Sequence, residues 1–208
     1  MNDGLQFTKL LAITGSQRKQ GNSYLLAKEV LKSIREVDYE IIQLAEKEIK
    51  FCDLCGKCEF GDCILKDDFN SIIEKMKVAD GLIFSFPKYF SVPSKFLCFL
   101  ERLDIIQHCK KYHGFRKAGV KPDLNFRPPF EGKPFCLFVV SGLGRGEEPL
   151  RLAAYEFVGM RMKLIMHDSR PFLGVLVKGE YRGEVLKDWK GIEDCRRLVR
   201  KLVDSINH

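Results

Sequence analysis

Residues 8–23 read TKLLAITGSQRKQGNS, a short apolar run that ends at Gly15 and leads into a polar loop. An apolar run of this length next to a glycine is typical of a buried strand, Thr8–Thr14. Apolar residues then recur at helical spacing through Asn22–Arg35, which predicts a helix directly after the loop. A strand, a loop and a helix in this order form the first unit of an alternating α/β fold.

Strands and helices alternate along the rest of the chain. Apolar runs predict strands at Tyr39–Leu44, Gly81–Phe86, Pro134–Val140 and Met162–His167, and Phe172–Val177 either extends the last strand or follows it. Helical spacing predicts a helix from Asp67 or Asp68 through Met76, and others at Pro93–Ile106, Glu147–Met160 and Ile192–Ile206. Such alternation requires a parallel sheet that is covered on both faces. We expect one flavodoxin-like α/β domain over residues 1–208, a doubly wound, five-stranded parallel sheet of order 2-1-3-4-5.

The composition is that of an ordinary globular protein. The chain has 208 residues, of which 45% are hydrophobic and 30% charged, and its net charge is +7. This mild excess of basic residues does not predict a nucleic-acid-binding protein. No apolar run approaches the ~20 residues of a membrane span, and the opening MNDGLQFTKL lacks the layout of a secretory signal. We therefore expect a cytoplasmic protein that binds neither a membrane nor a nucleic acid.

The loop after the first strand has the composition of a phosphate site. It lies at the edge where open α/β sheets bind ligands, and the helix N-terminus that follows attracts phosphate. Ser16, Asn22 and Ser23 offer side-chain hydrogen bonds, Arg18 offers charge-assisted ones, and Gly21 lies among them. Neither Gly-Lys-Ser/Thr nor G-x-G-x-x-G is present here, so a monophosphate such as that of FMN fits better than a nucleoside triphosphate or a dinucleotide. The alternative is a plain capped helix start.

Two further loops at the same edge complete a predicted flavin pocket. The loop after the third strand contains Pro87, Lys88, Tyr89, Phe90 and Ser91. Its aromatic rings can flank a planar ring system, although aromatic core packing is the alternative. The loop after the fourth strand contains Gly142, Leu143 and Gly144. Its glycines allow close approach of the backbone to a ligand.

Four of the eight cysteines are clustered within residues 45–66, the predicted cluster-binding loop. They have the spacing C-x2-C-x2-C-x4-C and are Cys52, Cys55, Cys58 and Cys63. In a reducing cytosol such a group more often binds metal than forms disulfides. Zinc usually draws its ligands from two C-x2-C pairs with a long spacer, whereas a tight run is typical of iron–sulfur clusters, with each thiolate on a different iron. The spacing favours an iron–sulfur cluster over zinc and over a site without metal.

A long segment, His108–Lys133, interrupts the alternation of strands and helices before the fourth strand. It has no clear periodicity, contains seven basic and two acidic residues, and supplies +5 of the net charge. It is either a solvated surface insertion or a lid or docking arm for an anionic ligand, a neighbouring subunit or an acidic electron carrier. Cys109 falls in this polar segment and receives no role. The remaining cysteines lie in apolar stretches and are predicted core residues: Cys98, Cys136 and Cys195.

Together these motifs resemble the iron–sulfur flavoprotein family, within the superfamily of NADPH-dependent FMN reductases and flavodoxin-like proteins. The resemblance is carried by GSQRKQGNS, by CDLCGKCEFGDC with the following Asp67-Asp68, by ADGLIFSFPKYFSVPSKFLCFLER and by SGLGRGEE, and it covers nearly the whole chain. It implies a homo-oligomer, dimer or tetramer, in which each subunit binds one FMN and one 4Fe-4S cluster. It also implies that each cluster lies near the flavin of a neighbouring subunit.

The resemblance also implies roles for single residues. The FMN phosphate is expected at Ser16, Arg18, Asn22 and Ser23. Pro87–Ser91 are expected to surround the isoalloxazine, with Gly142–Gly144 beside it. Two features depart from the family: Lys88 places a cation where a small apolar residue is expected, and the insertion at 108–133 is longer than usual.

Two functions compete at this point. In the first, the 4Fe-4S cluster accepts single electrons from a ferredoxin-like donor, and FMN passes electrons to an acceptor. In the alternative, the protein is an NAD(P)H-dependent FMN or quinone reductase whose cysteines are structural or unmetallated. A zinc-bearing module whose basic insertion binds nucleic acid has the least support. We expect an oxidoreductase in which the cofactors carry the chemistry, so that no side chain need act as an acid or base.

Overall fold

The computed structural model describes residues 7–35, 37–59, 61–112, 121–142, 145–169 and 171–207. Its strands are β1 (Thr8–Thr14), β2 (Val37–Gln43), β3 (Gly81–Pro87), β4 (Pro134–Ser141), β5 (Lys163–Leu164) and β6 (Val175–Lys178). Its α-helices are α1 (Asn22–Leu31), α2 (Phe69–Val78), α3 (Ser94–Lys111), α4 (Glu147–Gly159) and α5 (Trp189–Asn207). Single 3₁₀ turns form at η1 (Leu44–Glu46), η2 (Lys57–Glu59) and η3 (Glu184–Lys187). No helix within these ranges is long and apolar enough to cross a membrane.

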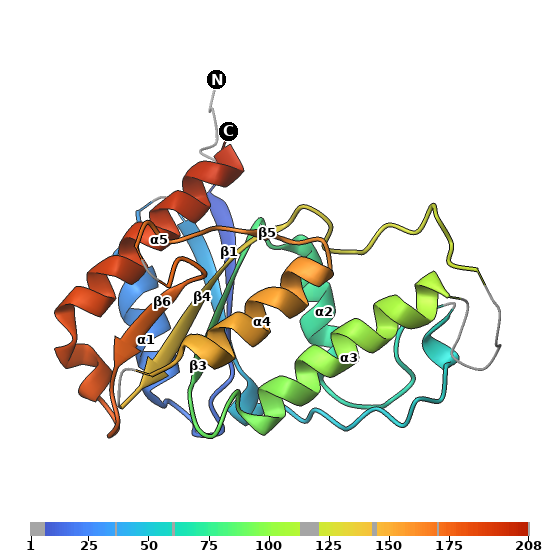
Figure 1. The fold of residues 1–208 in the computed structure, drawn as a ribbon, viewed down its shortest axis with the longest axis horizontal. Helices are drawn as coiled ribbons and strands as arrows, with labels where there is room; N and C mark the ends of the chain where they lie inside the picture. Colours follow the sequence, from blue (N-terminus) through green and yellow to red (C-terminus); the bar gives the residue numbers. More distant parts are fainter. Residues whose placement is uncertain are drawn as a thin grey trace.

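The strands form one parallel sheet in the order β2-β1-β3-β4-β5, and β6 also pairs with β4. This confirms the predicted flavodoxin-like order of five sheet positions. Helices α1 and α5 pack on one face of the sheet, and α2, α3 and α4 pack on the other (Figure 1). The sheet is therefore the middle of three layers.

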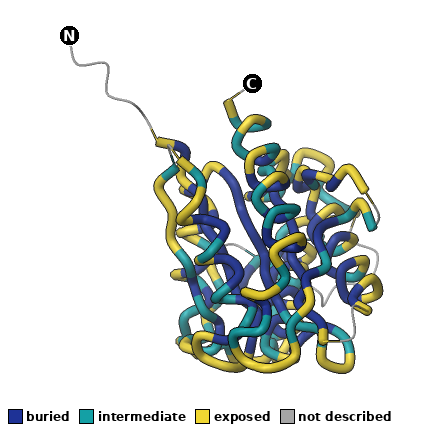
Figure 2. Tube along the Cα trace, turned by 90° about the vertical axis from the view of Figure 1, so that its left-hand side faces the viewer, coloured by how far each residue is buried: buried dark blue, intermediate teal, exposed yellow. Residues whose placement is uncertain are grey.

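Both faces of the sheet are apolar because both are covered. In β1, Leu11 and Ile13 pack toward α2, α3 and α4, whereas Leu10 and Ala12 pack toward α1 and α5. Figure 2 shows the buried strands in the interior, between helices whose outer sides are exposed. A parallel sheet with both faces buried leaves its strand ends as the place where a ligand can enter.

The fifth sheet position differs from the prediction. The sequence predicts one strand at Met162–His167, but only the two residues of β5 pair with β4. The chain then leaves the sheet, turns at Phe172 with a φ of 60°, and returns as β6 further along β4. A Cβ on Gly174 would lie 2.4 Å from the carbonyl oxygen of Leu137, so this close return requires glycine. The predicted segment Phe172–Val177 therefore follows the fifth strand rather than extending it.

Helix α3 is longer than predicted. It continues to Lys111, five residues beyond the predicted end at Ile106. The first residues of the predicted insertion at 108–133 are therefore helical, and placing Cys109 in a polar loop was wrong. Phe130, near the other end of that insertion, is buried in the core. By contrast, α1 ends four residues before its predicted end.

The start of α2 is tied to the segment that carries the cysteines. The sequence predicts that Asp67 or Asp68 caps this helix. The carboxylate of Asp67 accepts the N–H of Phe69 at 3.1 Å, which satisfies one of the first helical donors. Asp68 instead reaches back to the chain after β2, where its carboxylate accepts the N–H of Glu48 at 2.8 Å. The two aspartates thus serve both the helix and the preceding loop.

Candidate cofactor cleft and cysteine pocket

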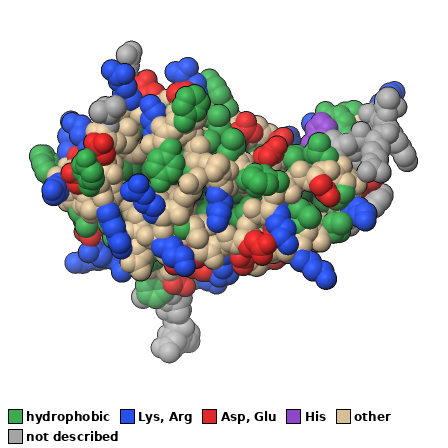
Figure 3. Space-filling model, turned by 90° about the horizontal axis from the view of Figure 1, so that it is seen from below, with side chains coloured by type: hydrophobic (Ala, Val, Ile, Leu, Met, Phe, Trp, Pro, Cys, Tyr) green, Lys and Arg blue, Asp and Glu red, His purple; other side chains and the backbone are tan. Residues whose placement is uncertain are grey.

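A cleft of about 340 Å³ opens at the carboxyl ends of β1, β3 and β4. Its volume falls within the range of small-molecule sites, and its position is the ligand edge of an open α/β sheet. Figure 3 looks at the molecule from this side, where Lys and Arg side chains are spread over the middle of the face. The fold therefore provides a cleft of suitable size at the predicted edge.

Nine of the predicted cofactor residues line this cleft: Ser16, Arg18, Gly21, Asn22, Ser23, Pro87, Lys88, Tyr89 and Gly142. Two others do not line it. Phe90 is 99% exposed, and the hydroxyl of Ser91 donates to a carboxylate oxygen of Glu148 at 2.7 Å. Leu143 and Gly144 lie outside the described residues.

The loop at 15–21 is a tight turn held by hydrogen bonds within the loop. The N–H of Arg18 donates to Ser16 Oγ at 3.0 Å, and the N–H of Gly21 donates to the carbonyl of Arg18 at 3.3 Å. A Cβ on Gly21 would lie 2.9 Å from Ser16 Oγ, so a side chain there would crowd the turn. Ser23 is fully buried in the first turn of α1, and its hydroxyl has no hydrogen-bond partner in the described part of the chain. A phosphate oxygen at this helix N-terminus would satisfy that costly unpaired group.

Asn22 holds a neighbouring loop instead of pointing a free amide into the cleft. Its Oδ1 accepts the N–H of Gly183 at 2.7 Å, and its Nδ2 donates to the carbonyl of Tyr181 at 2.9 Å. Both polar atoms of the side chain thus fasten the loop after β6 to the start of α1. This loop supplies three lining residues that the sequence did not single out: Gly179, Glu180 and Arg182.

The loop after β6 is well fixed, although sequence reasoning missed it. The carboxylate of Glu184 accepts the backbone N–H groups of Tyr181 at 2.9 Å and of Glu180 at 3.0 Å, and these bonds hold the pKa of Glu184 below its usual range. A Cβ on Gly179 would lie 2.8 Å from the backbone nitrogen of Val185. The signal was a short apolar run followed by a glycine-containing polar loop, the pattern already noted after the first and fourth strands.

The four clustered cysteines line one small pocket together with Arg102, Ile105 and Ile106 of α3. The part of the chain that carries them, within residues 45–66, is called the cysteine segment, and it runs along α3. The thiol of Cys98 donates to the carbonyl of Lys50, and the thiol of Cys109 donates to the carbonyl of Gly56, both at 3.4 Å. Cys98 and Cys109 are eleven residues apart, about 16 Å along a helix. In Figure 1 the turn η2 lies beside the end of α3 that is far from the strand ends.

Because the cysteine loop follows the second strand, the sequence predicts that it lies beside the flavin on the carboxyl edge of the sheet, and the structure corrects this expectation. The segment does start at that edge, directly after β2 and η1. It then follows α3 outward, and the cysteine pocket shares no lining residue with the cleft. Within one chain the two candidate sites are therefore separate.

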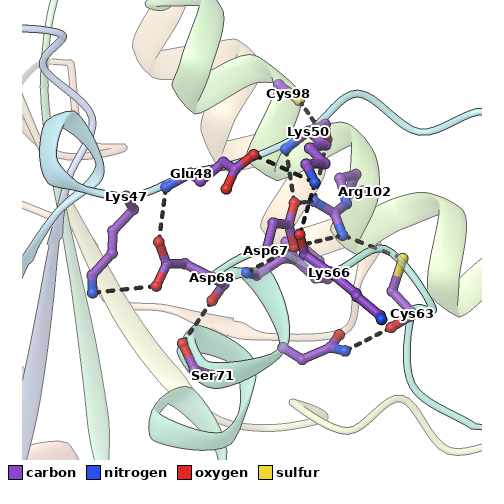
Figure 4. A network of polar contacts seen from close by, with 12 residues as sticks. Lys47, Glu48, Lys50, Cys63, Lys66, Asp67, Asp68, Ser71, Cys98 and Arg102 are labelled. Atoms are coloured by element: carbon purple, nitrogen blue, oxygen red, sulfur yellow. Dashed lines mark hydrogen bonds and ion pairs between the residues drawn. The ribbon is translucent and has the colours of Figure 1, made fainter.

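The cysteine segment is anchored through Asp67 and Arg102 (Figure 4). The carboxylate of Asp67 accepts the N–H of Lys50 at 2.8 Å. Arg102 binds that carboxylate and also donates to the carbonyl of Lys50 at 3.1 Å and to Cys63 Sγ at 3.2 Å. Burial alone would raise the pKa of Asp67, but the Arg102 guanidinium and the backbone donors outweigh it and hold this pKa below its usual range.

Cys109 belongs to the surroundings of the cysteine segment. It is buried, and burial, followed by the effect of the neighbouring Cys109 thiol, raises the pKa of Cys58 to about 12. The signal in the sequence was the spacing Cys98, Arg102, Ile105 and Cys109, which places four residues on one helix face. The prediction of buried positions is confirmed for Cys98, Cys136 and Cys195.

The donor set of the pocket suits a cluster, although the metal site itself stays a prediction. In the ranges that the structure describes, no three His, Cys, Asp or Glu side chains are placed to hold a metal ion. The four clustered cysteines are free thiols that share one pocket, and a guanidinium faces the sulfur of Cys63. A cluster takes one thiolate on each iron, so it needs four sulfurs around a shared space.

Residues 8–167 match the family described as NADPH-dependent FMN reductase. The chain belongs to this family. An iron–sulfur flavoprotein of Archaeoglobus fulgidus is 46% identical to it over 207 residues, which cover 94% of each chain. An iron–sulfur flavoprotein of Methanocaldococcus jannaschii is 30% identical over 203 residues, 95% of this chain and 97% of that one. Within the FMN reductase family, the chain thus groups with the iron–sulfur flavoproteins.

A solved flavodoxin from the domain Archaea has the same fold. Its TM-score is 0.54 and its identity 16%, and the match covers 97% of this chain and all of the other. At this identity the likeness concerns the fold alone. Membership of the FMN reductase family makes the chain a flavoprotein oxidoreductase with FMN as its flavin.

Replacing Asn22 by alanine is expected to loosen the loop after β6. The N–H of Gly183 loses its acceptor, and one hydrogen bond contributes about 1 kcal/mol, so its hydrogen exchange should become about fivefold faster or more. Exchange of the backbone amides at 179–185 measures this directly. Gln17→Ala is the control, because Gln17 Nε2 binds Ser94 Oγ at 2.7 Å and does not contact this loop. Unchanged exchange in Asn22→Ala would show that Asn22 does not hold the loop.

Proposed function

We propose that this protein passes electrons between a one-electron donor such as ferredoxin and an acceptor, through a 4Fe-4S cluster in the cysteine pocket and FMN in the cleft. The proposal rests on one observation above all: four free cysteines at the spacing C-x2-C-x2-C-x4-C line a single pocket. Relatives that are named iron–sulfur flavoproteins support it.

The cleft offers separate parts for the phosphate and the ring of FMN. Ser16, Arg18 and Ser23, with the N-terminus of α1, would take the phosphate. Lys88 and Tyr89 would lie beside the ring. Their loop is fixed to β4, because the N–H of Lys88 donates to the carbonyl of Val140 at 2.8 Å. Bound FMN supplies the redox chemistry, since a flavin carries one or two electrons. The residues of the cleft would bind and orient the FMN.

The cysteine pocket would hold a one-electron carrier. The proposed ligands, one thiolate on each iron, are Cys52, Cys55, Cys58 and Cys63. Of these, Cys58 is buried and the other three are partly exposed, so the pocket is open to the outside on one side. Ile105 and Ile106 of α3 form an apolar wall on the other side.

The length of α3 separates the two sites of one chain. The helix begins beside the phosphate loop, where Gln17 binds Ser94, and reaches the cysteine pocket at Arg102 and beyond. Because electron transfer slows steeply with distance, we propose a homo-oligomer, dimer or tetramer, in which the cluster of one subunit serves the flavin of another. Exposed apolar side chains on the cysteine segment support such a contact: Phe51 (77%), Leu54 (53%) and Ile64 (50%).

A second candidate function rests on the family itself. The family is described as NADPH-dependent, which favours a nicotinamide as the electron donor. In this version NAD(P)H reduces the flavin, the acceptor is a free flavin or a quinone, and the cysteines have a structural role. The two functions therefore differ in their donor and in whether iron is needed.

Serine at any of the four pocket cysteines is expected to abolish the cluster while FMN is retained, because the two sites share no residue. Wild-type protein purified without oxygen should contain about four iron atoms per chain, and each variant close to none. Iron, sulfide and flavin analyses measure this. Cys109→Ser is the matched control and should keep its iron. Iron-free wild-type protein would overturn the proposed function, and iron loss in Cys109→Ser with retention in Cys58→Ser would reassign the ligand.

Arg18→Gln is expected to weaken FMN binding tenfold or more without weakening riboflavin binding. A charge-assisted hydrogen bond contributes about 1.5–3 kcal/mol, and tenfold corresponds to about 1.4 kcal/mol. Quenching of flavin fluorescence in titrations of the flavin-free protein gives both affinities. Arg151→Gln, on the exposed side of α4, is the control. An equal loss for FMN and riboflavin would remove Arg18 from the phosphate site.

Lys110 and Lys111 form the basic end of α3, close to the cysteine pocket. If an acidic ferredoxin docks there, changing both to glutamine should slow its reduction of the protein severalfold and flatten the dependence of the rate on salt. Anaerobic stopped-flow measurements with reduced ferredoxin and with NADPH give the rates. Lys190→Gln, on α5, should change neither rate. Faster reduction by NADPH than by ferredoxin in the wild type would favour the second candidate.

A further inference from the structure

Arg102 is a buried cation. Its side chain is 1% exposed, and it is paired with the fully buried carboxylate of Asp67. Arginine is almost never fully buried unless it is paired, and a buried ion pair stabilises a fold no better than apolar residues of the same volume. The stability of the fold therefore does not account for this pair.

The contacts of Arg102 connect both ends of the cysteine segment. One terminal nitrogen donates to the carbonyl of Lys50 at 3.1 Å and to Asp67, and the other donates to Cys63 Sγ at 3.2 Å and to Asp67 at 3.3 Å. Lys50 precedes the first clustered cysteine, and Cys63 is the last. The guanidinium also lies 4.0 Å from the ring centre of Phe69. Figure 4 shows Arg102 between Lys50, Asp67 and Cys63.

One donor of Arg102 is left without a partner in this arrangement. Its Nε is buried and makes no hydrogen bond within the described chain, although an unpaired buried donor is costly. The side chain therefore aims its two terminal nitrogens at the carboxylate, the carbonyl and the sulfur. A fork of this shape is specific to arginine, since a lysine offers a single point charge.

We propose that Arg102 is a positioning residue for the cluster: it holds the Cys63 sulfur in place and raises the reduction potential of the cluster. This inference rests on the proposed function, because it requires a cluster bound through Cys63. Reduction adds negative charge to a cluster, and a hydrogen bond from a buried cation to a ligand sulfur stabilises the reduced form more than the oxidised form. Outer contacts of this kind also orient metal ligands.

The test compares Arg102→Gln, Arg102→Lys and the control Arg127→Gln with the wild type. Arg127 carries the same charge, but its side chain is 83% exposed. We expect Arg102→Gln to lower the equilibrium constant for one-electron reduction of the cluster at least tenfold, a fall of ~59 mV. Arg102→Lys keeps the charge and should show a smaller fall, while Arg127→Gln should show none. Potentiometric titration followed by electron paramagnetic resonance gives the cluster potential, and the flavin potential from the same samples should not change.

The outcomes separate this inference from the proposed function. Wild-type protein without iron would overturn both. Iron-containing Arg102→Gln and Arg102→Lys variants with the wild-type cluster potential would overturn only the role of Arg102. If Arg102→Gln folds but retains no iron, the decision falls to Arg102→Lys: restored iron with a lowered potential supports the proposal, and restored iron with the wild-type potential contradicts it. If neither variant retains iron, cluster rebuilding in the presence of guanidinium should restore it in Arg102→Gln, and failure there would overturn the positioning role.

Discussion

The burial of both faces of a parallel sheet is the constraint on which the rest of the structure depends. Helices cover the two faces completely enough that the inner residues of β1, β3 and β4 are all but inaccessible. The strand ends are where a ligand can reach the sheet, and the cleft forms there between the loops after β1, β3, β4 and β6. Anything else that the chain carries must lie outside the three layers, as the cysteine segment does.

The cysteine segment has little regular structure and depends on side chains from elsewhere for its shape. Between η1 and η2 its backbone turns through left-handed conformations at Leu54 and Gly56. Asp67 and Asp68 hold its beginning through backbone N–H groups, and α3 supplies Arg102 and Cys109 along its length. A loop with four thiols and few hydrogen bonds of its own can be precise only if polar groups from α3 and from the residues just before α2 hold it.

The sequence predicted the strands because buried parallel strands are continuous apolar runs that can be found locally, and their alternation with helices then predicted the sheet order. It also predicted most of the cleft, because a glycine-rich loop directly after a strand can be recognised from the local sequence alone. The prediction failed where tertiary contacts, rather than the hydropathy of the local sequence, decide the structure. The end of α3 buries Gln107 and Cys109, so its inner face reads as polar. The fifth position of the sheet is shared by β5 and β6, whereas the sequence predicted one strand there. The loop after β6, which Asn22 fastens, was therefore not assigned to the cleft.

Helix α3 sets the relation between the two sites. Its 18 residues form a rod of about 27 Å, with Ser94 at the phosphate loop and Cys109 at the cysteine segment. The rod is packed into the core through Phe96 and Phe99, so its ends cannot approach each other without loss of the fold. The cleft and the cysteine pocket, to which we assign the flavin and the proposed cluster, therefore lie at different points along this rod. The exposed apolar residues of the cysteine segment are the feature that supports the proposed contact with a second copy, whose cleft would then lie beside them.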